Sequence, residues 1–160
     1  MPNTVFISFD DGEPPLNSLI SESELIPFIL NVLEKRGHSL WELSLFITNN
    51  SNIQKINKEY RNIDEPTDVL SFPMGEMYVD EKGLEHFIAG DIIISLDCVC
   101  ENAKRFSTSF NEELKRMIIH SILHLEGMDH STNEMNEPML LLQEEILIHF
   151  ENFKIIKNGN

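Results

Sequence analysis

The sequence predicts an α+β fold, in which a small mixed four-stranded sheet is covered by about five helices. Runs of β-branched and aromatic residues alternate with segments of helical period in the first two thirds of the chain, and the last third is almost entirely helical in period. The 160 residues contain no repeat or linker and are enough for one hydrophobic core. We therefore expect a single compact domain over residues 1–153, followed by a frayed tail over 154–160.

From the N-terminus, TVFISFD (4–10) is apolar and β-branched, which predicts a first strand. Serines at the start and a glycine at the end predict a helix over 21–37. WELSLFIT (41–48) alternates apolar with other residues, which is the period of a strand. A helix over 49–62 follows, because its apolar residues have helical spacing and a Ser-to-Gln capping box stands at its start.

DVLSFP (68–73) predicts a short strand that a proline closes. GDIIISL (90–96) is the most strand-like run, and a helix begins near Leu96. The polar segment MGEMYVDEKGLEH between these strands predicts a hairpin-like excursion. The segment 110–127 is a strong helix, with apolar residues at i, i+4, i+8 and i+11, and a last helix lies within 131–153.

The composition excludes several classes of protein. The net charge of −15 argues against nonspecific binding to nucleic acid, which needs positive charge to displace counterions, and against an anionic membrane surface. The net charge does not exclude a cleft that is locally basic. No apolar run is long enough to span a membrane, and the N-terminus lacks the basic segment of a secretory signal. We expect a cytoplasmic protein with neither DNA nor a membrane as its partner.

The cysteine pattern agrees with that location. Cys98 and Cys100 are separated by one residue, a spacing that suits neither a strain-free disulfide nor a C-x-x-C metal site. We expect a small buried apolar residue and an inert neighbour in a reducing compartment.

The segment HSILHLEGMDH holds three of the six histidines in the pattern H-x3-H-x5-H. His120 and His124 lie one helical turn apart, so both imidazoles leave the same face. Gly127 can adopt the left-handed conformation that reverses the chain, which would bring His130 over that face. Three imidazoles with a fourth position left for water are typical of a catalytic zinc site. The sequence therefore predicts a three-histidine metal cleft, whereas His38, His86 and His149 are expected to be structural.

Zinc peptidases with the pattern H-E-x-x-H-x-x-G-x-x-H have the same spacing, but the position of their catalytic glutamate holds Ser121 here. Serine cannot act as the general base at neutral pH unless another base activates it. A peptidase with this sequence would therefore retain the zinc ligands but lack the general base that its mechanism needs. Glu126 and Asp129 are nearby carboxylates that occupy other positions. Asp129 either orients an imidazole or forms the turn.

A second candidate cluster is YRNIDEPTDVLSFP (60–73). Arg61 falls where a helix gives way to a loop, so its guanidinium could project into a cleft and bind phosphate through two parallel hydrogen bonds. The alternative is an ion pair with Asp64 or Asp68, and the local sequence favours it.

Together these segments resemble a known family. HSILHLEGMDH is similar to the signature H-G-x-L-H-L-x-G-x-D-H of the YbeY family of bacterial ribosomal-RNA maturation factors. YRNIDEPTDVLSFP resembles that family's Y-R-x-x-D-x-P-T-D-V-L-S-F-P, and AGDIIIS resembles its G-D-I-x-I-S strand. Order and spacing agree over residues 40–150, and Ser121 stands where the family usually has glycine.

The resemblance implies a metal-dependent, single-strand-specific endoribonuclease that matures the 3′ end of small-subunit ribosomal RNA and takes part in ribosome quality control. It implies one zinc ion held by His120, His124 and His130 plus water, with Arg61 as the catalytic and substrate-binding residue. The implied partners are ribosomal RNA precursor, the small ribosomal subunit and its assembly factors. Zinc would activate water or polarise the phosphate, while Arg61 would bind the phosphate. Either water or another oxygen could be the attacking group.

The acidic charge opposes RNA binding, so any RNA cleft must be locally basic. The mid-chain candidates for it are Lys55, Lys58, Arg61, Lys104 and Arg105. The main alternative function is a non-catalytic ribosome-assembly factor with a structural zinc, because an acidic surface suits docking on basic ribosomal proteins. A zinc peptidase is the weaker alternative.

Overall fold

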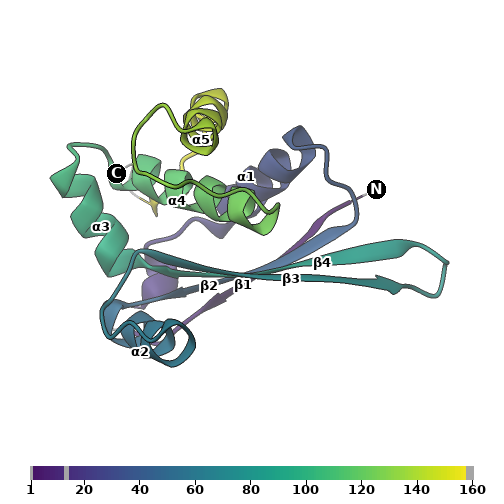
Figure 1. The fold of residues 1–160 in the computed structure, drawn as a ribbon, viewed down its shortest axis with the longest axis horizontal. Coiled ribbons are helices and arrows are strands. Elements are labelled where there is room, and N and C mark those ends of the chain that lie inside the picture. The colour runs from purple at the N-terminus through teal and green to yellow at the C-terminus, as the bar shows by residue number, and fades with distance from the viewer. Residues whose placement is uncertain (1, 13–14, 158–160) are drawn as a thin grey trace.

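The structure, a computed structural model, describes residues 2–12 and 15–157 (Figure 1). The predicted mixed four-stranded sheet and five helices are confirmed within these residues. The elements in chain order are β1 (Thr4–Phe9), the 3-10 turn η1 (Leu16–Ser18), α1 (Glu22–Lys35), β2 (Trp41–Thr48), α2 (Asn50–Arg61), β3 (Val69–Val79), β4 (Glu85–Ser95), α3 (Leu96–Arg105), α4 (Phe110–Leu125) and α5 (Pro138–His149).

The sheet has the strand order β1-β2-β4-β3. β1 and β4 run parallel to β2, whereas β3 runs antiparallel to β4 at the edge. Helices α1, α4 and α5 lie on one side of the sheet and α2 lies on the other (Figure 1). Alternate residues of β2 and β4, such as Leu45 and Ile92, are almost fully buried under α1 and α4, because side chains on a strand alternate between its two faces.

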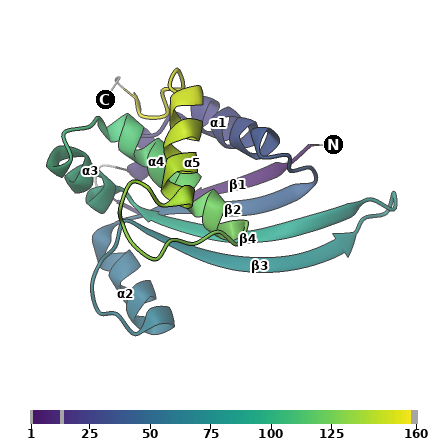
Figure 2. The same cartoon turned by 45° about the horizontal axis from the view of Figure 1, so that its top comes forward.

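The hairpin of β3 and β4 is longer than the sequence predicted. The polar segment that was expected to be an excursion is itself paired, from Glu76 opposite Ile88 to Val79 opposite Glu85. Pro73 does not close the strand, because a bulge between Pro73 and Glu76 accommodates the missing N–H. The far end of this hairpin projects beyond the helices (Figure 2).

Gly90 of β4 lies close to β3 and to the end of α4. Its φ is +145°, and a Cβ at this position would lie 2.2 Å from the carbonyl oxygen of Phe72 and 3.0 Å from Leu125 Cδ2. A glycine is therefore required here. Because Gly90 has no Cβ, the end of α4 can pack closely against β3. The candidate site lies between these two elements.

The end of the chain also differs from expectation. Ile155 and Ile156 are almost fully buried, Ile156 forms a β-bridge with Ile20, and the Lys157 N–H donates to the Leu19 carbonyl at 2.9 Å. The frayed tail is therefore wrong for residues 154–157, because its apolar side chains complete the core. Residues 158–160 lie outside the described residues. Across the described part of the chain, no helix has the length and apolarity that crossing a membrane requires.

Candidate metal centre

The end of helix α4 reverses the chain as the sequence predicted. The Gly127 N–H donates to the His124 carbonyl at 2.9 Å, and the Met128 N–H donates to the Leu123 carbonyl at 3.0 Å. This is the paired hydrogen-bond pattern of a helix end that needs a left-handed residue, and Gly127 has a φ of +97°. The reversal carries His130 back over the face of α4.

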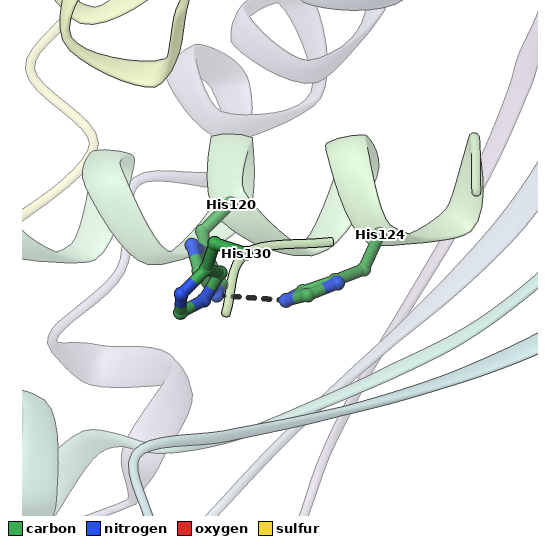
Figure 3. A group of neighbouring side chains, drawn as sticks. All are labelled: His120, His124 and His130. Carbon is green, nitrogen blue, oxygen red and sulfur yellow. Dashed lines mark hydrogen bonds between the residues drawn. The ribbon is translucent and has the colours of Figure 1, made fainter. Parts of the chain in front are cut away.

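Three imidazoles converge at this place (Figure 3). His120 and His124 project from the same face of α4, and their Nε2 atoms lie 2.9 Å apart. His130 approaches from the loop, and one ring nitrogen of each histidine lies within 4.8 Å of the others. The structure thus brings together the three histidines that the sequence singled out.

The other ring nitrogen of each histidine faces an oxygen that accepts a hydrogen bond. These pairs are His120 Nδ1 with Gln143 Oε1 at 2.7 Å, His124 Nδ1 with the Met128 carbonyl at 3.0 Å, and His130 Nδ1 with the Thr132 carbonyl at 2.7 Å. Because these oxygens can only accept, each Nδ1 carries the hydrogen. The lone pair of each Nε2 is then left for the centre of the cluster.

This donor set fits a metal ion. With the hydrogens on Nδ1, the Nε2 lone pairs of His120 and His124 face each other at 2.9 Å, an arrangement that a cation bound between them would stabilise. Tetrahedral coordination with bonds of about 2.0–2.1 Å would place ligand nitrogens roughly 3.4 Å apart, close to the arrangement present. Burial lowers the pKa of His120, and although the hydrogen bond to Gln143 raises it, the nearby imidazoles of His124 and His130 lower it again. The lowered pKa favours the neutral imidazole that a metal needs.

A cleft of about 470 Å³ opens beside His120 and His124. It is lined by residues of the α2–β3 connection, of β3 and of the end of α4: Arg61, Asp68, Val69, Leu70, Ser71, Pro73, His120, His124, Gly127, Met128 and Asp129. Arg61 therefore shares one cavity with His120 and His124, although about 60 residues of sequence separate it from them.

The local ion pair that the sequence favoured for Arg61 is wrong. Within residues 2–12 and 15–157, no carboxylate lies at ion-pair distance from Arg61, and Asp64 is instead 3.8 Å from Lys58. The Arg61 Nη2 donates to the Ser71 carbonyl at 3.0 Å, and its guanidinium lies 5.6 Å from the centre of the Phe72 ring. β3 is an edge strand, so a carbonyl on its outer side is available to accept this hydrogen bond.

The two polar residues nearest the histidines in sequence have other roles. Ser121 is fully buried and does not line the cleft, so the position of a peptidase glutamate faces the core. Asp129 Oδ1 accepts from the backbone N–H of His130 at 2.8 Å, which favours the turn-forming role over contact with an imidazole.

Glu126 has a role that the sequence did not indicate. It accepts three hydrogen bonds from Arg36, including the one from Nη2 to Oε1 at 2.8 Å, and its Oε2 lies 2.6 Å from His38 Nε2. His38 in turn stacks on Trp41 with ring centres 3.5 Å apart, so its predicted structural role is confirmed. Although burial raises it, the hydrogen bonds from His38 and Arg36 hold the pKa of Glu126 below its usual value. Glu126 therefore ties the end of α4 to the end of α1.

The sequence also missed Asp68 as a cleft residue. Asp68 lines both the metal cleft and an adjoining cavity of about 660 Å³, which Arg105 also lines. Of the basic residues proposed for an RNA cleft, Arg61 and Arg105 line these cavities, whereas Lys55, Lys58 and Lys104 do not. Arg116 also lines the adjoining cavity, but its guanidinium is paired with Glu113 and Glu144. Among the described residues, Arg61 and Arg105 therefore supply the positive charge of the two cavities that no carboxylate pairs.

Comparison with known proteins gives consistent similarities. The family model described as Endoribonuclease YbeY matches residues 17–151. A Treponema denticola protein named Endoribonuclease YbeY is 47% identical over 157 residues, covering 98% of this chain and 99% of the relative. A Borreliella afzelii protein of the same name is 47% identical over 122 residues, covering 75% and 80%. The solution structure of a Thermotoga maritima protein matches with a TM-score of 0.56 at 28% identity, covering 89% and 86%.

Proposed function

The chain belongs to the endoribonuclease YbeY family, and from this premise we propose that its three-histidine cluster and Arg61 form the active site of a metal-dependent endoribonuclease specific for single-stranded RNA. The reaction is hydrolysis of phosphodiester bonds of RNA. The observation that supports the proposal best is that ring nitrogens of three histidines converge and that two of these histidines, His120 and His124, line one cleft together with Arg61.

We propose His120, His124 and His130 as ligands of one zinc ion, with water as the fourth ligand. The support is the donor set, because three neutral imidazoles suit zinc and leave an open position. When bound, zinc supplies a Lewis acid that activates water or polarises a phosphoryl oxygen.

Arg61 is proposed to hold the scissile phosphate. Its hydrogen bond to the Ser71 carbonyl uses one of the five guanidinium donors and fixes the long side chain at the rim of the cleft. The remaining donors can pair with two phosphate oxygens in the geometry that arginine favours. A side chain held in advance loses less conformational entropy on binding, so the phosphate is positioned at low cost.

The proposed substrate is the precursor of small-subunit ribosomal RNA, cleaved at its 3′ end, with a further role in ribosome quality control. The net charge of −15 supports docking on basic proteins of the small ribosomal subunit and its assembly factors, which would deliver the RNA to Arg61 and Arg105. We place this work in the cytoplasm. Free thiols at Cys98 and Cys100 suit its reducing conditions, and burial raises the pKa of Cys98 to about 11, which keeps that thiol unreactive.

The test is cleavage of a defined single-stranded ribosomal-RNA precursor by zinc-loaded protein, with the same RNA annealed to its complement as the duplex control. Arg61→Ala and His124→Ala are each expected to lower the cleavage rate by about 100-fold or more, the loss typical of removing one group that stabilises transition-state charge. Arg61→Lys keeps the positive charge but cannot donate two parallel hydrogen bonds from one planar group, so it should recover only part of the rate. Lys35→Ala, at the exposed end of α1, is the matched loss of a charge outside the cleft and should leave the rate unchanged.

Two results would overturn the proposal. Wild-type protein that cleaves single-stranded RNA no faster than His124→Ala does would exclude the catalytic role of the cluster. Protein that co-sediments with small ribosomal subunits, irrespective of Arg61, and cleaves no RNA would instead be a non-catalytic assembly factor.

A further inference from the structure

His120 differs from the other two histidines in what holds its Nδ1. His124 and His130 face backbone carbonyls, which accept hydrogen bonds and cannot donate them. His120 faces the side-chain amide of Gln143 at 2.7 Å. An amide can turn by half a rotation and present an NH2 group in place of its oxygen, so the protonation pattern of His120 depends on what fixes Gln143.

A carboxylate fixes the amide. Gln143 is 5% exposed, and its Nε2 donates to Glu144 Oε2 at 3.0 Å. The hydrogen bonds from Arg116 and Gln143 outweigh the effect of burial and hold the pKa of Glu144 below its usual value, so Glu144 is an anion that only accepts. With its nitrogen turned to Glu144, Gln143 must turn its oxygen to His120.

Glu144 is itself held from its other side. Arg116 donates to both carboxylate oxygens, from Nε to Oε2 at 2.9 Å and from Nη2 to Oε1 at 3.0 Å. Arg116 Nη1 also donates to Glu113 Oε1 at 2.7 Å, and Glu113 is 3% exposed. Arg116, Glu144, Gln143 and His120 thus form a chain of hydrogen bonds. Because arginine can only donate, it fixes the direction of every hydrogen bond along this chain.

We propose that Gln143 is a positioning residue of the metal centre, and that Glu144 and Arg116 lock its amide so that the Nε2 lone pair of His120 faces the metal. The inference rests on the metal site of the proposed function. It adds that α5 selects the tautomer of one ligand, which no residue of the histidine motif can do. With the amide reversed, His120 would carry its hydrogen on Nε2, and that nitrogen could not bind a metal.

The variant that tests the lock is Glu144→Gln. A second amide can donate where the carboxylate only accepted, so it permits Gln143 to reverse. The matched control is Glu145→Gln, which makes the same change of charge at the next, exposed residue of α5. Gln143→Met is the second variant, because it removes the acceptor beside His120 with little change in volume and leaves Glu144 and Arg116 paired.

The primary readout is the tautomer of His120 in zinc-free protein, from two-bond ¹H–¹⁵N spectra at mildly alkaline pH. Wild type and Glu145→Gln should show hydrogen on Nδ1, whereas Glu144→Gln and Gln143→Met should show a mixture or hydrogen on Nε2. The second readout is zinc affinity in competition with a chelator, expected to fall by about 10- to 100-fold in both variants and not in the control. Circular dichroism establishes that each variant is folded.

The outcomes separate this inference from the proposed function. An unchanged His120 tautomer in Gln143→Met, or in folded Glu144→Gln, overturns the inference even if the wild type binds zinc and cleaves RNA. A changed tautomer supports it even if no variant cleaves RNA, in which case the proposed function fails alone. A lower zinc affinity with the tautomer unchanged also counts against it, because such a loss would reflect altered packing only.

Discussion

We predict that Ser121→Ala stabilises the protein, although this residue stands inside the metal-binding motif. The side chain of Ser121 is 0% exposed, and its Oγ has no hydrogen-bond partner among the described residues. A buried hydroxyl without a partner keeps the cost of leaving water and gains nothing in return. Alanine removes that oxygen and keeps the Cβ that packs in the core.

The expected magnitude follows from three contributions. An unsatisfied buried hydroxyl costs about 1–3 kcal/mol. Alanine exceeds serine in helix propensity by about 0.5 kcal/mol in the interior of a helix such as α4. The small void left by one oxygen offsets about 1 kcal/mol of this gain. The net increase in the free energy of unfolding is about 0.5–2.5 kcal/mol, or a rise in Tm of about 1–10 °C for a chain of this size.

The assay is urea denaturation of zinc-free protein, supported by thermal unfolding. Ser121→Gly is the companion variant, because it removes the same hydroxyl and costs about 1 kcal/mol in helix propensity relative to alanine. The free energy of unfolding should therefore be highest for alanine. A Ser121→Ala protein that is less stable than wild type would refute the reasoning, since it would mean that the hydroxyl is hydrogen-bonded in the native state.

Three further substitutions test the frame around the site. Gly90→Ala should destabilise the fold by at least about 3 kcal/mol in urea denaturation, because its Cβ would lie 2.2 Å from a backbone oxygen that cannot move alone; stability close to wild type would contradict the close approach of β3 and β4. Gly127→Ala meets no atom within 4 Å, so only its positive φ is strained, and we expect a loss of about 1–2 kcal/mol together with weaker zinc binding by titration. The lowered pKa of Glu126 means that its contribution is fully present above its usual pKa of 4.5 and is lost as the pH falls through the folded-state value. Stability measured from neutral to acidic pH should accordingly fall less steeply for Glu126→Gln than for wild type, and equal slopes would exclude this role.

Local sequence predicted most of the elements and the histidine cluster. The alternation of strand 41–48 and the apolar stripe of 110–127 reflect the periods of single elements, and both elements are present in the structure. The histidines could be read in the same way, because a separation of four residues places His120 and His124 on one helix face, and a glycine three residues later reverses the chain. Each of these relations spans only a few residues.

The tertiary structure alone decided the contacts that join distant segments. Arg36 and Glu126 are 90 residues apart, and His120 and Gln143 are 23 residues apart. No periodicity relates such pairs, so the sequence described Glu126 only as a nearby carboxylate and did not single out Gln143. The burial of Ile155 near the end of the chain also depends on tertiary packing. So does the contact of Arg61 with the edge strand β3 in place of the loop carboxylates. The sequence alone therefore determined which side chains could bind a metal, because that depends on helix geometry. The tertiary structure decided how they are oriented, because that depends on which elements pack together.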